Sequence, residues 1–87
     1  MKIKDGFILR QVADTYIVVA VGQAVKSFNG IINLNETGAF LWKFFAEEHT
    51  LNEGVAALLG EYDVDEALAR EEVEKFLETI ERHGFTE

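Results

Sequence analysis

The first 34 residues consist of short apolar runs separated by polar residues and glycines, a pattern typical of β-strands. Phe7 to Val12 and Thr15 to Val21 are rich in β-branched and aromatic residues, and Ala13 and Asp14 between them suit a tight turn. Because Tyr16 to Val19 has no polar face, we expect the second strand to be central or buried on both faces. The pattern therefore predicts an antiparallel hairpin at the start of the chain.

The segment after this hairpin has two interpretations. Ala24 to Phe28 is a weaker extended segment, and Asn29 with Gly30 is a dipeptide favoured in two-residue hairpin turns, with Ile31 to Leu34 as the return strand. If Ser27 to Gly30 is instead a plain loop, the sheet has three strands and not four. In both cases the last strand is a candidate for the edge of the sheet, where unpaired backbone groups are open to another chain.

From Asn35 onward the apolar residues recur at helical spacing, which predicts a first helix from about Glu36 to Ala46. Asn35 is expected to cap this helix by accepting a hydrogen bond from a backbone N–H of its first turn. Gly38 lies inside the helix, where it would allow close packing on the sheet. Trp42 fits the core or its rim better than the alternative, a surface anchor for a partner.

Two further helices follow. Thr50 and Glu53 have the spacing of a capping box, so a second helix is expected from here to about Tyr62. Asp63 and Asp65 both offer a cap for a third helix. The apolar face of this helix consists of Leu68, Val73, Phe76, Leu77 and Ile80. Gly84 at its end suits a left-handed cap.

This order of elements and the length of 87 residues predict one α+β domain over residues 1–87, with an N-terminal antiparallel sheet of three to four strands followed by three helices. The absence of cysteine excludes disulfides and thiolate metal sites. The formal net charge of −8 argues against nucleic-acid binding. The start of the chain lacks the apolar region of a signal peptide and no apolar run is long enough to span a bilayer, so we expect a soluble, cytoplasmic protein.

The sequence offers little for catalysis. The carboxylates fall mostly at turns and on helix surfaces, and no pair of them is marked as sharing a cleft. The histidines, His49 and His83, are far apart in sequence and lie near helix ends, so we expect exposed residues there and not a metal site. We therefore expect no enzymatic activity, no metal and no cofactor.

A set of residues over nearly the whole chain resembles the pattern of the PqqD family. Its most specific parts are the Leu-Asn-Glu-Thr-Gly start of the first helix and the Val-x-x-Phe-Leu run of the third. The residues that carry the resemblance are Asn29, Gly30, Leu34, Asn35, Glu36, Thr37, Gly38, Leu41, Trp42, Thr50, Tyr62, Val64, Val73, Phe76, Leu77 and Gly84.

The resemblance implies a winged-helix-like fold and a non-catalytic function. Such domains are recognition elements for ribosomally made, post-translationally modified peptides. They bind the leader segment of a precursor peptide and present it to a modifying enzyme, often a radical S-adenosylmethionine enzyme. The leader adds as a strand to the third strand, in the groove beside the third helix. Carried onto this chain, the peptide-binding residues are Ile31, Ile32, Asn33, Leu34, Ala69, Val73, Phe76 and Ile80.

Several alternatives remain at this level. Between the first two helices, Glu47 to His49 replaces an Asp-Gly pair common in the family, which favours a modified peptide other than a quinone-cofactor precursor. A winged-helix DNA-binding regulator and a structural enzyme subunit are the competing functions, and a second copy could pair with the exposed edge to form a homodimer. An acidic third helix suggests a ligand that carries Lys or Arg; its glutamates are Glu71, Glu72, Glu74, Glu78 and Glu81.

Overall fold

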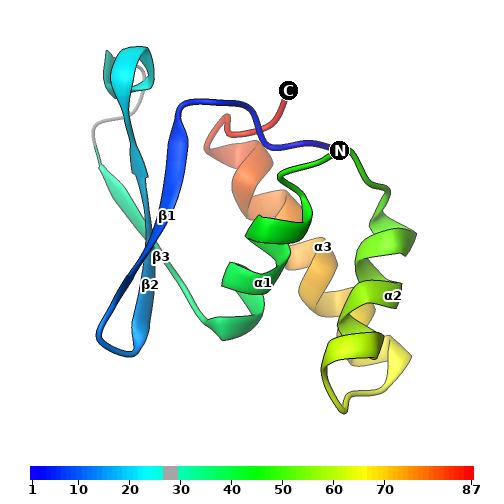
Figure 1. Cartoon of the computed structure of the whole chain (residues 1–87). Coiled ribbons are helices and arrows are strands. Elements are labelled where there is room, and N and C mark those ends of the chain that lie inside the picture. The colour runs from blue at the N-terminus through cyan, green and yellow to red at the C-terminus, as the bar shows by residue number, and fades with distance from the viewer. Residues whose placement is uncertain (27–29) are drawn as a thin grey trace.

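A three-stranded antiparallel sheet forms one layer of the molecule, and the three helices lie on one side of it, with α2 packed on the other two helices away from the sheet (Figure 1). The structure is a computed structural model that describes residues 1–26 and 30–87. The predicted α+β arrangement is confirmed. The elements are β1 (Phe7–Val12), β2 (Thr15–Ala20), the short 3-10 helix η1 (Gly22–Lys26), β3 (Ile31–Leu34), α1 (Glu36–Phe44), α2 (Leu51–Glu61) and α3 (Glu66–Arg82).

The sheet has the order β1-β2-β3, so the prediction that β2 is central is confirmed. The register pairs Val18 with Leu9 on one side and with Ile32 on the other, and Val18 is fully buried against the helices. The alternating positions face outward, where Val12 is 53% and Ile31 57% exposed. The expectation that β2 is buried on both faces is therefore wrong, because no described element covers the outer face.

The segment between β2 and β3 differs from the predicted extended segment Ala24 to Phe28. Gly22 adopts a positive φ of 60°, and the chain continues as η1, with the Ala24 N–H donating to the Val21 carbonyl at 3.2 Å. The prediction of an extended segment is therefore wrong for residues 24–26, because the turn at Gly22 redirects the chain before a further strand can pair with the sheet. The remainder of that segment and Asn29 of the predicted hairpin turn lie outside the described residues.

The predicted starts of α1 and α2 are confirmed. The Asn35 side chain accepts a hydrogen bond from the Gly38 N–H at 2.7 Å. Thr50 and Glu53 form a reciprocal capping box, with distances of 2.8 and 3.1 Å. The first helix ends at Phe44, two residues before the predicted Ala46. Local side chain to backbone bonds of this kind depend on few residues, which is why the sequence pattern reveals them.

The third helix is capped by Asp65, whose side chain accepts from the Leu68 N–H at 2.8 Å, so the other candidate, Asp63, is wrong. Its predicted end is confirmed, because Gly84 follows the helix with a φ of 76°. No helix among the described residues is long and apolar enough to cross a bilayer.

The core lies between the sheet and the helices and also includes both ends of the chain. Trp42 is 5% exposed, which confirms its interpretation as a core residue and excludes its role as a surface anchor. Ile3 forms a β-bridge with Thr86, a pairing of the termini that the sequence did not predict. The largest fully buried side chains are Phe45, Phe85, Leu41, Leu58, Ile80, Val18 and Val73.

Candidate functional site

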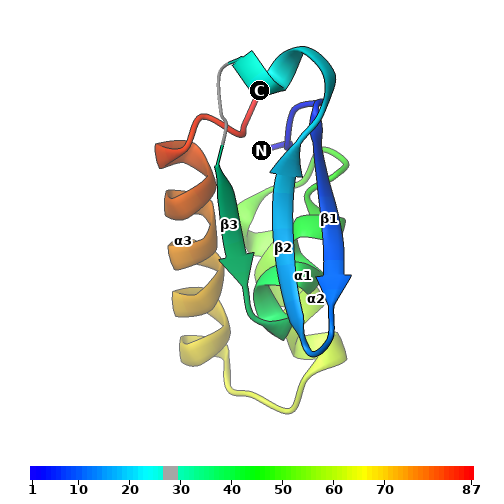
Figure 2. The same ribbon diagram turned by 90° about the vertical axis from the view of Figure 1, so that its left-hand side faces the viewer.

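The outer edge of β3 is the open edge beside α3. Figure 2 shows β3 between β2 on one side and α3 on the other. Its backbone pairs with β2, and no described strand pairs with its other edge. Such an edge presents N–H and C=O groups that an extended chain can use.

A pocket of about 260 Å³ lies between this edge and α3, and we call it the groove pocket. Its walls come from the end of β3, the first turns of α1 and the middle of α3, so three elements build one recess. The lining residues are Asn33, Leu34, Asn35, Thr37, Gly38, Leu41, Glu72, Lys75, Phe76 and Thr79.

Gly38 brings α1 close to β3 at this point. A Cβ atom at this position would lie 3.3 Å from both the Cβ and Cδ2 atoms of Leu34 and 3.2 Å from the Asn35 side-chain oxygen. The expected role of Gly38 in close packing on the sheet is confirmed. The strand passes into the helix through the single residue Asn35, so the end of β3 and the start of α1 meet at a tight corner closed by the Asn35 cap.

The groove pocket has an apolar floor and a polar rim. Leu41 and Phe76 in the floor are almost fully buried. On the rim, Lys75 forms an ion pair with Glu71 at 2.9 Å, and this carboxylate raises the pKa of Lys75, with a smaller effect from Glu72. Amides and hydroxyls of the rim, together with the strand edge, offer hydrogen-bonding partners to a peptide backbone.

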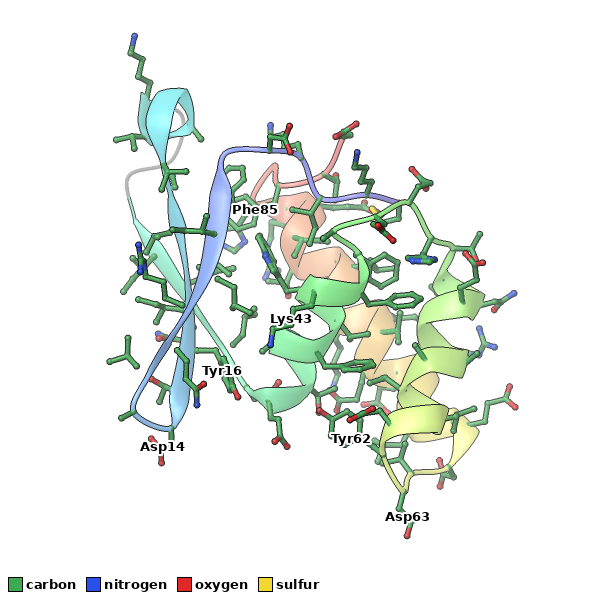
Figure 3. All side chains as sticks on the ribbon, viewed as in Figure 1. Asp14, Tyr16, Lys43, Tyr62, Asp63 and Phe85 are labelled. Carbon is green, nitrogen blue, oxygen red and sulfur yellow. The ribbon has the colours of Figure 1, made fainter. Side chains whose placement is uncertain are left out.

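A second pocket of about 120 Å³ adjoins the groove pocket, with which it shares Thr37 and Glu72. It lies where the end of α2 meets the start of α3, near Tyr62, which Figure 3 labels beside the end of α2. Burial raises the pKa of the Tyr62 phenol, with smaller effects from nearby acids. The other lining residues of this second pocket are Leu58, Val64, Leu68 and Ala69.

The cations of α3 are already paired within their own helix. Arg70 lies 3.5 Å from Glu66 and Arg82 lies 3.7 Å from Glu78, in addition to the Lys75 pair. A DNA-reading helix instead needs free cations that neutralise phosphates. The surface of α3 therefore does not favour the DNA-binding alternative.

The two histidines take part in local contacts. His49 stacks on the Phe44 ring, with a centroid distance of 3.9 Å, and its Nδ1 atom lies 3.4 Å from the Glu53 carboxylate. His83 lies within hydrogen-bonding distance of the Thr79 carbonyl, at 2.8 Å. Within residues 1–26 and 30–87, no group of three or more potential ligands is placed to hold a metal ion.

The residues assigned to peptide binding from the resemblance fall into three groups. Asn33, Leu34 and Phe76 line the groove pocket, and Ala69 lines the second pocket. Ile31 and Ile32 lie in β3 and would contribute backbone groups, since the register turns the Ile31 side chain to the outer face and that of Ile32 to the core.

Val73 and Ile80 form the third group. Both are fully buried, with no exposed surface, and belong to the core. They line neither the groove pocket nor the second pocket of this structure, so their assignment to peptide binding stays a prediction. From α3, Glu72, Lys75 and Thr79 line the groove pocket together with Phe76. The sequence analysis named Glu72 only as one of several acidic residues and missed Lys75 and Thr79, because it looked for an apolar wall. The polar positions Glu72, Lys75 and Thr79, spaced at helical intervals, were the available signal.

Comparison with known proteins agrees with this architecture. The family model described as coenzyme PQQ synthesis protein D (PqqD) matches residues 8–85. The chain belongs to the PqqD family. No curated protein matches it significantly.

Two solved structures share the PqqD-like fold with this chain. One is TbiB1 in complex with the TbiA(beta) leader peptide, with a TM-score of 0.76 and 23% identity, covering 100% of this chain and 95% of the other. The second is lasso peptide synthetase B1 complexed with its leader peptide, with a TM-score of 0.71 and 16% identity, covering 95% and 92%. At these identities the comparisons establish a common fold.

Proposed function

We propose that this PqqD-family protein is a non-catalytic binding protein that captures the leader segment of a ribosomally made precursor peptide. The observation that carries the proposal is the open edge of β3 directly beside the groove pocket. The peptide adds as a strand to Ile31–Leu34, and its side chains enter the groove against α3. The two structural neighbours, each of which is a complex with a leader peptide, support this function.

The energetics of strand addition explain why the groove is needed as well as the edge. A backbone hydrogen bond contributes about 1 kcal/mol net, while ordering one peptide residue costs about 1–2 kcal/mol. Backbone pairing alone therefore cannot hold a flexible segment. A buried apolar side chain contributes about 1.5–3 kcal/mol, and the floor formed by Leu34, Leu41 and Phe76 can receive one.

The captured segment is presented to a separate modifying enzyme, for which the family resemblance favours a radical S-adenosylmethionine enzyme. The genes beside the one for this protein test that partner. A short precursor-peptide gene together with a radical enzyme gene is expected. A different modifying enzyme in their place would overturn the partner class and leave peptide capture standing.

Blocking the groove tests the capture itself. Thr79 lines the groove pocket from α3, so Thr79→Trp fills the recess with a large ring and is expected to weaken peptide binding by about tenfold or more. The probe is a displayed library of random dodecapeptides selected on the immobilised protein. Affinities of recovered peptides are then measured by titration, and the amide signals of Ile31–Leu34 are expected to shift.

Glu74→Trp is the matched control, because Glu74 lies on the same helix, is exposed and lines neither pocket. It is expected to leave affinity within about twofold of the parent protein. A library that yields no binder, or binders that tolerate Thr79→Trp and shift amides elsewhere, would overturn the proposed function.

A further inference from the structure

Glu72 lies in the wall that the groove pocket and the second pocket share. Its side chain is half-buried, and it forms no ion pair with any cation of the described residues. Its neighbour Glu71 instead pairs with Lys75, and Glu78 pairs with Arg82. Among the glutamates of α3, Glu72 is thus the carboxylate that lines the site. Its nearest cation there, Lys75, is paired with Glu71 and interacts with Glu72 only at longer range.

The two pockets follow one line along α3. One face of α3 carries Leu68, Glu72 and Phe76, which are spaced four residues apart. Thr79 lies on the same face, about one turn further along the helix. Leu68 stands at the far end and is 45% exposed, although it is a large apolar side chain. A strand paired with β3 that continues past Leu34 therefore meets Glu72 and then the second pocket.

The dimensions fit a peptide in extended form. The α3 residues of the two pockets are centred about six positions apart, or about 9 Å along the helix at about 1.5 Å per residue. An extended chain covers that distance in about three residues. The volume of about 120 Å³ in the second pocket is close to the ~150 Å³ of cavities that hold a benzene ring, so one apolar side chain can enter it.

We propose that the bound peptide extends from the β3 edge into the second pocket and places a lysine or arginine side chain on Glu72, between two apolar side chains that occupy the two pockets. This inference rests on the proposed function and names the class of sequence captured. A half-buried carboxylate has lost part of its hydration, and a cation of the peptide restores the lost interaction. An acidic residue at the same place would be repelled, so Glu72 selects by charge.

Library selection tests the role of Glu72. Dodecapeptides recovered on the parent protein are expected to be enriched in Lys or Arg between two apolar positions. Glu72→Gln is expected to remove that enrichment while the apolar positions persist, and to weaken a recovered peptide by about five- to tenfold. Raising NaCl from about 50 to 500 mM should weaken binding to the parent protein more than binding to the variant. Glu74→Gln, on the same helix outside both pockets, should change affinity by less than about twofold.

A second pair of variants, one test and one control, examines the second pocket. Leu68→Ala should relax the apolar preference at one end of the recovered peptides, whereas Leu59→Ala should not, because Leu59 is similarly exposed at 39% but lines neither pocket. Peptides that depend on Thr79 yet show no Lys or Arg enrichment, or bind Glu72→Gln equally well, would overturn this inference and leave the proposed function intact. A loss of all binders would overturn both.

Discussion

Gly54 and Gly60 lie in the same helix, α2, but in opposite surroundings. A Cβ atom at Gly54 would lie 2.9 Å from the Cζ atom of Phe45 and 3.3 Å from a methyl carbon of Val73, both fully buried. Nothing lies within 4 Å of a Cβ atom at Gly60. The first glycine is therefore required by packing, while the second only lowers the helix propensity.

Alanine at these two positions should act in opposite directions. Gly60→Ala is expected to raise the free energy of unfolding by about 0.5–1 kcal/mol through helix propensity. Gly54→Ala makes the same gain but crowds the core, at a cost of about 1–3 kcal/mol, so it should be destabilising overall. Urea denaturation of both variants checks this. Equal effects of the two changes would contradict the packing role of Gly54.

At the scale of the element, the starts of α2 and α3 each use a single carboxylate, Glu53 and Asp65. The backbone N–H of Thr50 donates to Glu53 and, together with nearby His49, lowers the pKa of that carboxyl. A carboxyl with a lowered pKa stabilises the fold above its ordinary value near 4.5, and the stabilisation is lost as the pH falls through the folded value. The start of α2 should accordingly weaken in acid.

The variant Glu53→Gln separates the titration of Glu53 from that of the other ionisable groups of the protein. Glutamine can still accept the Thr50 N–H but carries no charge to lose. The parent protein should be more stable than the variant at pH 6, and the difference should shrink at pH 3. Urea midpoints at both pH values measure it. A difference that stays constant between them would show that Glu53 does not titrate with folding.

The cap of α3 allows a similar comparison. Asp65 accepts the Leu68 N–H, whereas Asp63 belongs to the preceding connection and is exposed. Asp65→Ala is expected to lower the free energy of unfolding by about 1 kcal/mol, and Asp63→Ala to change it by less than about 0.5 kcal/mol. Thermal and urea unfolding distinguish them, and a larger loss from Asp63→Ala would contradict the assigned cap.

At the scale of the whole molecule, Phe85 joins segments that are far apart in sequence. Its ring lies 4.4 Å from that of Phe7 in β1 and 5.9 Å from that of Trp42 in α1, between centroids. Figure 3 shows it between β1 and the helices. Its backbone carbonyl accepts the Lys4 N–H at 2.8 Å. The two ends of the chain thus close the core together.

Phe85→Ala should be among the most damaging single changes outside the groove. Removing a fully buried phenylalanine costs about 3–5 kcal/mol, a large fraction of the stability of a small domain. Val12→Ala on the open face of the sheet should change stability by less than about 0.5 kcal/mol. Chemical denaturation of both variants is the measurement. A mild effect of Phe85→Ala would show that the termini are not part of the cooperative unit.

The candidate site was predictable only in part. The edge position of Ile31–Leu34 could be anticipated because Asn35 ends the strand and begins the next helix within one residue. The residues of the groove wall could not be anticipated. Val73 and Glu72 are adjacent in sequence, and only the rotation of α3 about its axis decides which of the two side chains faces the core. An apolar pattern identifies the buried face of a helix, whereas the groove lies along its border.

Sequence patterns were sufficient to locate the three strands and three helices, the caps at Asn35, Thr50 and Gly84, and membership in the PqqD family, but not the short helix η1. These features rest on interactions between residues a few positions apart. The covering of the sheet on one face, the bridge between Ile3 and Thr86, and the meeting of two pockets at Glu72 became visible only in the folded chain. Each of these depends on how whole elements pack, and packing joins residues whose separation along the chain carries no local signal.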